Sequence, residues 1–106
     1  MILYGIPTCD TCRKARKALE AAGHVVQFHD LRADPLSAET LAEFYAAFGD
    51  KLLNRASTTW RGLSEENRAA PVLDLLKAHP TLIKRPVIRG ASLTLGWDKT
   101  AQSAHL

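Results

Sequence analysis

Apolar positions at the start of this chain change from a continuous run to helical spacing and back to a run. Residues 2–6 are mostly apolar and end at Pro7, which predicts a short buried strand. A helix should follow and end at Gly23, because apolar residues recur at helical spacing at Ala15, Ala18, Leu19 and Ala22. Residues 25–29 predict a second strand. The first thirty residues therefore predict a β-α-β unit.

The middle of the chain has the pattern of short amphipathic helices. Ser37 is a suitable N-cap for a helix that ends at Gly49 and carries on one side Leu41, Phe44, Tyr45 and Phe48. Residues 51–54 predict a further helical turn, and residues 55–61 a polar loop. We expect Ser64 to cap another turn. Pro71 suits a first helical position, and that helix should bury Val72, Leu75 and Leu76 and stop at His79-Pro80.

The last quarter of the sequence predicts a β-hairpin. Two mainly apolar segments, residues 82–88 and 93–96, flank a tight turn at residues 89–92. Asp98 can cap a final short helix. The order of elements suits an α/β fold with a four-stranded mixed sheet flanked by helices. We expect residues 1–106 to form a single domain in which residues 34–80 are an inserted helical portion.

Composition narrows the possible functions. The chain has 106 residues, no apolar run long enough to span a bilayer and no basic leader at its start, so we expect a cytoplasmic protein with no membrane association. Its formal charge of +3 suits a small anionic substrate, and we expect no direct nucleic-acid binding. Nothing in the sequence requires more than a monomer. With only two cysteines and four scattered histidines, neither a disulfide scaffold nor a metal site is expected.

The two cysteines form a C-x-x-C motif between the first strand and the first helix. Cys9 precedes the helix, where unpaired backbone N–H groups and the helix dipole favour a thiolate and lower the thiol pKa. Arg13 lies one turn on and adds positive potential. Cys12 should be more buried, so we assign Cys9 as the nucleophile and Cys12 as the resolving thiol. The alternative is a pair of buried structural cysteines.

Arg85 and Pro86 are the second candidate feature. A proline within an apolar run indicates either a cis bond that turns the backbone toward the cysteines or a plain edge-strand proline, and the sequence alone allows both. Arg85 is correspondingly either an anion ligand or a solvated residue. Further candidates for substrate binding flank the cysteines, namely Thr8, Thr11 and Arg13.

Four segments together resemble the ArsC/Spx family, and most of all its YffB branch. They are residues 4–15 (Tyr-Gly-Ile-Pro-Thr-Cys-Asp-Thr-Cys-Arg-Lys-Ala), 52–54 (Leu-Leu-Asn), 58–61 (Thr-Thr-Trp-Arg) and 83–86 (Ile-Lys-Arg-Pro). The resemblance implies a thioredoxin-like fold with an inserted helical subdomain. It also implies that Pro86 is cis and that Arg85 points at the cysteines.

The resemblance also implies an activity. YffB-like proteins look like cytosolic thiol-disulfide oxidoreductases that use glutathione as co-substrate and hold no bound cofactor. Cys9 matches the cysteine that forms the arsenic adduct in arsenate reductases, which also use glutaredoxin. Arg85 matches one of their three oxyanion-binding arginines. Another falls on Asn54, beside Arg55, so both residues join the substrate-binding candidates; a small thiol or an oxyanion is the expected substrate.

A regulatory function is the alternative that the resemblance offers. Spx is a redox-sensing transcriptional regulator that carries a C-x-x-C switch and binds the C-terminal domain of the RNA polymerase α subunit. Cys9 and Cys12 match its pair, whereas the arginine of its inserted segment falls on Ala56 here. A second cysteine at position 12 also differs from the arsenate reductases, which have serine there.

Overall fold

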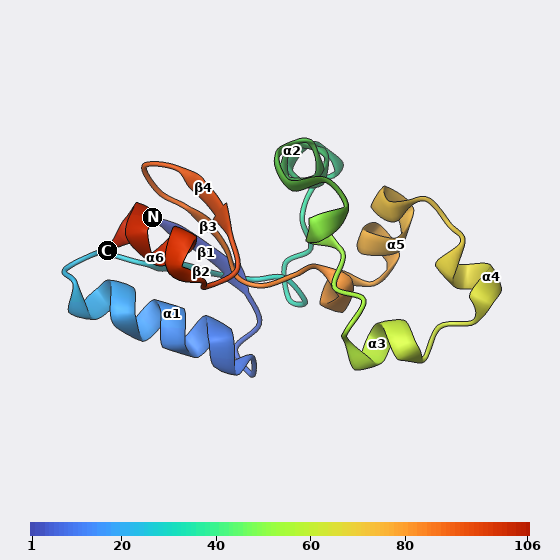
Figure 1. Ribbon diagram of the computed structural model, residues 1–106, viewed down its shortest axis with the longest axis horizontal. Coiled ribbons are helices and arrows are strands. Elements are labelled where there is room, and N and C mark those ends of the chain that lie inside the picture. Colours follow the sequence, from blue (N-terminus) through green and yellow to red (C-terminus); the bar gives the residue numbers. More distant parts are fainter. The chain divides into compact units, whose positions relative to one another are not determined.

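A computed structural model describes residues 1–106 of the chain. The chain forms two compact units: the sheet unit comprises residues 1–34 and 85–106, and the helical unit comprises residues 35–84 (Figure 1). No helix in either unit has both the length and the apolar character needed to cross a membrane.

The sheet unit contains all four strands. Its elements are β1 (Ile2–Gly5), α1 (Asp10–Ala21), β2 (Gln27–Asp30), β3 (Val87–Arg89), β4 (Leu93–Leu95) and α6 (Lys99–His105). The strand order is β2-β1-β3-β4, with β1 parallel to β2 and antiparallel to β3, and β3 antiparallel to β4. This arrangement confirms the predicted four-stranded mixed sheet flanked by helices.

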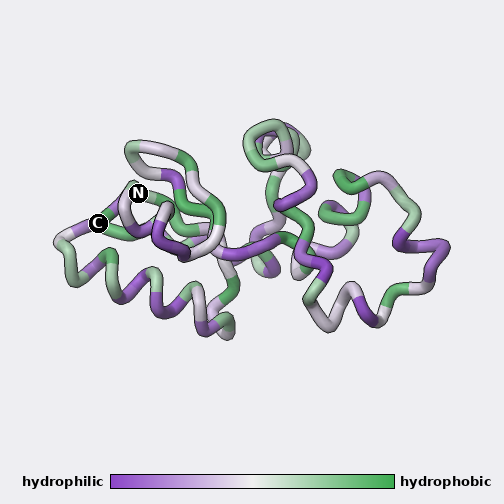
Figure 2. Tube along the Cα trace, viewed as in Figure 1, coloured by the Kyte–Doolittle hydropathy of each residue, from purple (hydrophilic) through white to green (hydrophobic).

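One face of the sheet carries the core of this unit. Leu3 lies opposite Phe28 on one side and Ile88 on the other, so these side chains share a face. Helix α1, which lies along the sheet in Figure 1, buries its apolar stripe there through Cys12, Ala15 and Leu19. The alternation of hydrophobic and hydrophilic residues along α1, visible in Figure 2, is what makes this one-sided burial possible.

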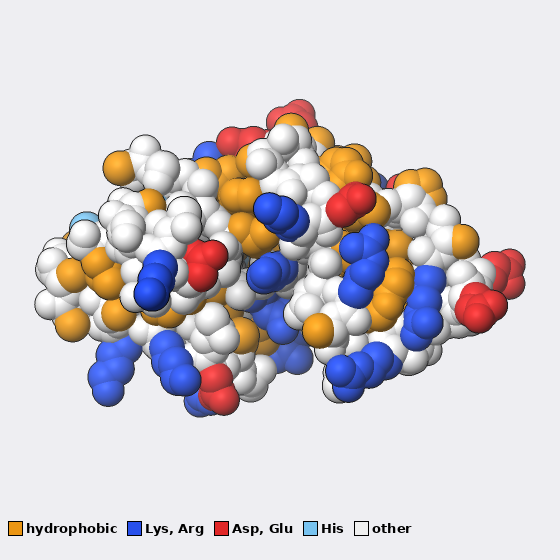
Figure 3. All heavy atoms as spheres, in the orientation of Figure 1, with side chains coloured by type: hydrophobic (Ala, Val, Ile, Leu, Met, Phe, Trp, Pro, Cys, Tyr) orange, Lys and Arg blue, Asp and Glu red, His pale blue; other side chains and the backbone are white.

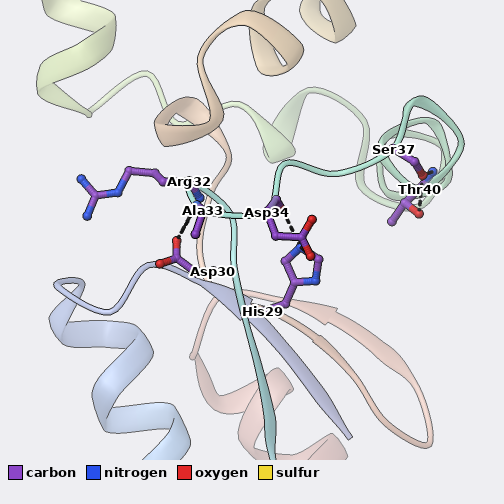
Figure 4. Close-up of polar contacts among 7 residues, drawn as sticks. All are labelled: His29, Asp30, Arg32, Ala33, Asp34, Ser37 and Thr40. Atoms are coloured by element: carbon purple, nitrogen blue, oxygen red, sulfur yellow. Dashed lines mark hydrogen bonds and ion pairs between the residues drawn. The ribbon is translucent and has the colours of Figure 1, made fainter.

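Polar contacts close the turn that follows β2 (Figure 4). Asp30 Oδ1 accepts hydrogen bonds from the backbone N–H groups of Arg32 and Ala33, at 2.9 and 3.3 Å. The His29 ring points at Asp34, with Nε2 lying 2.7 Å from its carbonyl oxygen and 3.7 Å from its carboxylate. These contacts hold the turn at the end of β2, where Leu31 is fully buried.

Short capped helices make up the helical unit. They are α2 (Ala38–Phe48), η1 (Gly49–Leu52), α3 (Thr58–Arg61), α4 (Glu65–Arg68), α5 (Val72–Ala78) and η2 (Pro80–Leu82). Ser37 and Ser64 accept hydrogen bonds from the backbone N–H groups of Thr40 and Asn67, which confirms both predicted caps; Figure 4 shows Ser37 beside Thr40. The buried side chains of this unit are Leu41, Phe44, Leu52, Leu53, Leu75, Leu76, Leu82 and Ile83.

An isolated antiparallel bridge joins two distant segments of the helical unit. Leu53 pairs with Ile83, the Asn54 N–H donates to the Leu82 carbonyl, and the Lys84 N–H donates to the Leu52 carbonyl, both at 2.8 Å. The chain just after η1 and the chain just after η2 are therefore held side by side.

Three sequence-based boundaries were wrong. The second strand begins at Gln27, opposite Ile2, because β1 offers no partner before that residue, and Val25 is 89% exposed. Residues 55–61 are not a plain loop, since Ser57 caps α3 through the Trp60 N–H. The strand expected over 82–88 is confined to Val87–Arg89, because Ile83 pairs with Leu53 instead.

Candidate functional site

Cys9 is the N-cap residue of α1, as predicted. Its backbone is extended, with φ −80° and ψ 118°, and its carbonyl accepts the first helical hydrogen bond from the Arg13 N–H at 3.1 Å. The Cys9 N–H donates to the Ile6 carbonyl at 3.0 Å, which closes a tight turn between β1 and the helix. This turn leaves the Cys9 side chain half-buried at the end of the helix where unpaired N–H groups gather.

Cys12 lies one turn into α1 and has no exposed surface. Its sulfur packs against Gly5 of β1, on the sheet face that Leu3 shares. A Cβ atom at position 5 would lie 2.5 Å from Cys12 Sγ and 3.2 Å from Leu3 Cδ2. Glycine is therefore required for the close approach of α1 to β1 at the second cysteine. Sequence reasoning missed this role, although an isolated glycine in a strand signals such an approach.

The two thiols have opposite acidities. Burial is the largest influence on Cys9 and opposes ionisation, but hydrogen bonds from the Cys12 N–H, the Cys12 thiol and the Arg85 guanidinium outweigh it and lower the Cys9 pKa. The positive charge of Arg85 acts in the same direction. Burial dominates at Cys12 and, with the neighbouring Cys9, raises its pKa to about 12. Neither cysteine is in a disulfide, so the pair consists of an acidic half-buried thiol and a buried protonated one.

Arg85 and Pro86 complete the sheet-unit part of the site. The peptide bond between them is cis, as the resemblance implied, and Pro86 is fully buried before β3. The Arg85 side chain reaches the Cys9 sulfur, where it supplies both a hydrogen bond and a positive charge. A guanidinium in this position also suits an anionic group on a bound substrate.

The other sheet-unit candidates lie outside this contact. Thr8 and Thr11 are exposed on the turn and on the first turn of α1. The exposed Arg13 pairs with the Asp10 carboxylate, so its guanidinium has a partner other than Cys9. The structure therefore brings Arg85, and not Arg13, into contact with the Cys9 sulfur.

Asn54 and Arg55 belong to the helical unit. Asn54 Oδ1 accepts a hydrogen bond from the Ala56 N–H at 3.1 Å, and the Arg55 guanidinium lies 5.5 Å from the centre of the Trp60 ring. Arg68 lies 5.3 Å from that ring and also donates to the Trp60 carbonyl. Trp60 is thus half-buried between two guanidinium groups.

The site contains the groups that thiol-disulfide exchange needs. The reactive thiolate is stabilised, and a second thiol lies in contact with it. No group of three or more His, Cys, Asp or Glu side chains gathers in a way that could hold a metal ion.

Comparison with known proteins identifies the family of this chain and structures with a similar fold. A model of the ArsC family matches residues 4–104. The structure of a protein named YffB superimposes with a TM-score of 0.89 and 38% identity, over 99% of this chain and 97% of that one. An arsenate reductase-related protein from Brucella melitensis gives a TM-score of 0.73 and 39% identity, over 98% and 92% of the two chains.

A regulator is also among the relatives. The global transcriptional regulator Spx of Bacillus subtilis is 30% identical to this chain, over 81% of it and 70% of Spx. The match to the family model covers nearly the whole sequence and includes both cysteines, Arg85 and Pro86. The chain is therefore a member of the ArsC family, with the thioredoxin-like fold that its sequence predicted.

Proposed function

We propose that this protein is a glutathione-dependent thiol-disulfide oxidoreductase, in which Cys9 is the nucleophile and Cys12 the resolving thiol. The observation that carries the proposal is the contrast between the two cysteines. The Cys9 thiolate is stabilised by the Cys12 N–H and Arg85, whereas the Cys12 pKa is raised to about 12. One sulfur is thus the more readily ionised and is the one that attacks, and the other keeps its proton until a disulfide forms beside it.

The proposed reaction proceeds in two exchanges. The Cys9 thiolate attacks one sulfur of a substrate disulfide, forms a mixed disulfide and releases the other sulfur as a thiolate. Cys12 then loses its proton to solvent and attacks Cys9 Sγ, which releases the second substrate thiol and leaves a Cys9–Cys12 disulfide. Two molecules of glutathione reduce this disulfide and leave as oxidised glutathione, and glutaredoxin is a possible alternative reductant.

Loss of the Cys9 negative charge in the mixed disulfide assists the second exchange. The Cys9 charge raises the Cys12 pKa in the free protein, in addition to burial. When Cys9 is bonded to the substrate that charge is gone, while the guanidinium of Arg85 still favours a Cys12 thiolate through its positive charge. The resolving thiol is therefore activated only after the first bond has formed.

The test is capture of the intermediate. The reduced protein is incubated with oxidised glutathione at neutral pH, quenched with acid and analysed by peptide mass spectrometry. We expect an internal Cys9–Cys12 disulfide in the wild-type protein, a glutathione adduct on Cys9 in Cys12→Ser, and no adduct in Cys9→Ser. Unmodified Cys9 in both the wild-type protein and Cys12→Ser would refute the proposal.

A redox-sensing regulator of the Spx type is the second candidate function. It is favoured by the Spx relatives and by the C-x-x-C pair that Spx also carries. A pull-down with the C-terminal domain of the RNA polymerase α subunit, with the protein reduced and then oxidised, tests it. Binding that differs between the two states would support this function, and absence of binding in both states would remove it.

A further inference from the structure

An open cleft of about 340 Å³ lies within the helical unit, in the size range of small-ligand sites. Its lining residues are Asp50, Lys51, Leu53, Asn54, Arg55 and Lys84. The bridge between Leu53 and Ile83 brings these residues together, because it holds the chain after η1 beside the chain after η2. Three cations from two distant segments thereby line a single cleft.

The cations of the cleft are not neutralised by this chain. Lys51 and Lys84 are exposed, and the ion pairs of the structure involve neither of them. The Arg55 guanidinium is oriented by the Trp60 ring, at 5.5 Å, and no ion pair includes it. Figure 3 shows Lys and Arg side chains gathered on one face of the helical unit, near α3. The cleft therefore has an excess of positive charge.

Asp50 contributes the one carboxylate of the cleft lining. The Tyr45 hydroxyl donates to Asp50 Oδ1 at 3.0 Å, and this hydrogen bond and the Asp50 charge raise the Tyr45 pKa. That hydrogen bond uses one carboxylate oxygen, and the second oxygen is also an acceptor. The lining thus combines three cations with one oriented carboxylate.

We propose that this cleft binds a zwitterionic peptide with two carboxylates and one ammonium group, as in glutathione. Lys51, Arg55 and Lys84 would hold the two carboxylates, and Asp50 would hold the ammonium. In the sequence, Lys84 of the cleft immediately precedes Arg85. The inference rests on the proposed function in taking glutathione as co-substrate, and it adds the residues that recognise it.

The binding test uses S-methylglutathione, which has the charges of glutathione but no thiol to exchange. It is titrated into the reduced full-length protein by calorimetry. We expect Arg55→Gln with Lys84→Gln to weaken binding about tenfold, because each removes a charge-assisted hydrogen bond to a carboxylate. The control, Arg61→Gln with Lys77→Gln, removes the same charge from residues of this unit outside the cleft lining, so it should bind as the wild-type protein does.

Asp50→Asn distinguishes a zwitterion site from a simple anion site. If Asp50 holds the ammonium, its replacement weakens S-methylglutathione binding several-fold. If the cleft only attracts anions, removing the carboxylate strengthens binding, which would overturn the proposal. Equal affinity of the wild-type protein, the cleft variant and the control would overturn it too, as would absence of binding to the wild-type protein.

Kinetics separate failure of this inference from failure of the proposed function. With the neutral disulfide bis(2-hydroxyethyl) disulfide, the cleft variant should lose less activity than with oxidised glutathione, for which its KM should rise. Normal exchange with both disulfides would overturn the cleft assignment and leave the oxidoreductase function intact. Absence of exchange with either disulfide in the wild-type protein would remove the oxidoreductase function, while the calorimetric result still decides whether the cleft binds the peptide.

Discussion

At the scale of single residues, Gly5 determines how closely the second cysteine can approach the sheet. Cys12 Sγ occupies the space that a side chain at position 5 would need, since a Cβ there would be 2.5 Å away. The neighbouring groups are the side chains of Cys12 and Leu3, both fully buried in a close-packed core, and neither can move aside cheaply. The position of the Cys12 thiol therefore depends on a residue that has no side chain of its own.

Gly5→Ala should destabilise the protein by about 1–3 kcal/mol, the usual effect of overpacking a buried site. Urea unfolding measures the change. Gly62→Ala is the matched control, because its Cβ would meet nothing closer than the Thr58 carbonyl oxygen at 3.5 Å, an ordinary contact. Equal stability of the two variants would show that α1 and β1 are less closely packed than described.

Arg85 helps to lower the pKa of Cys9. Arg85→Gln should slow the reaction of Cys9 with a neutral disulfide several-fold at pH 7, because the hydrogen bond and positive charge that help to lower the Cys9 pKa are weakened or lost. Arg13→Gln should leave the rate unchanged, since that guanidinium pairs with Asp10. Stopped-flow measurement of both variants tests this, and a larger effect at Arg13 than at Arg85 would reverse the assignment.

At the scale of secondary-structure elements, local signals were enough to predict most helix ends. Ser37, Ser64 and Asp98 each cap the helix that was expected of them, and Gly49 follows α2 with a positive φ of 61°. These features depend on residues within a few positions of one another, so the sequence alone contains the information. The position of Cys9 before α1 was predictable for the same reason.

Strand boundaries could not be predicted, because they depend on distant partners. Val25 has strong β propensity, but β1 begins at Ile2 and no strand lies beside residue 25. Residues 82–84 looked like strand and instead form a bridge with the segment around Leu53. The partner of Arg13, by contrast, was within reach of the sequence, since Asp10 is the one carboxylate within four positions of it.

Helix α6 contains a group that should make its docking sensitive to acid. Burial, together with the positive potential of His24, lowers the His105 pKa, and His105 Nε2 lies 2.8 Å from the hydroxyl of Thr94 on β4. The unfolded chain therefore binds a proton at His105 more readily than the folded chain does. Stability should fall as pH decreases from about 6.5, the unfolded value, to the lower folded value.

Urea unfolding at pH 7 and at pH 5.5 measures this effect. His105→Gln should lose less stability between the two pH values than the wild-type protein, whatever its stability at pH 7. An unchanged pH dependence in His105→Gln would exclude this histidine as the cause.

At the scale of the whole molecule, the reactive centre comes from both ends of the chain. Cys9 and Cys12 lie in residues 1–34 and Arg85 and Pro86 in residues 85–106, and together these segments form the sheet unit. The 50 residues 35–84 form the helical unit between them. The sulfur chemistry thus belongs to the sheet unit, and the cleft that we assign to peptide recognition belongs to the helical unit.

The proposal that Cys9 is an activated nucleophile is tested most directly by the pH dependence of Cys9 alkylation. The rate of reaction of Cys9 with iodoacetamide is measured in the native reduced protein across the pH range, with the urea-unfolded protein as reference. Cys12, with a pKa of about 12, stays protonated and buried over most of this range. We expect a midpoint for native Cys9 below that of the unfolded chain, and a midpoint equal to or above the unfolded value would show that Cys9 is not activated.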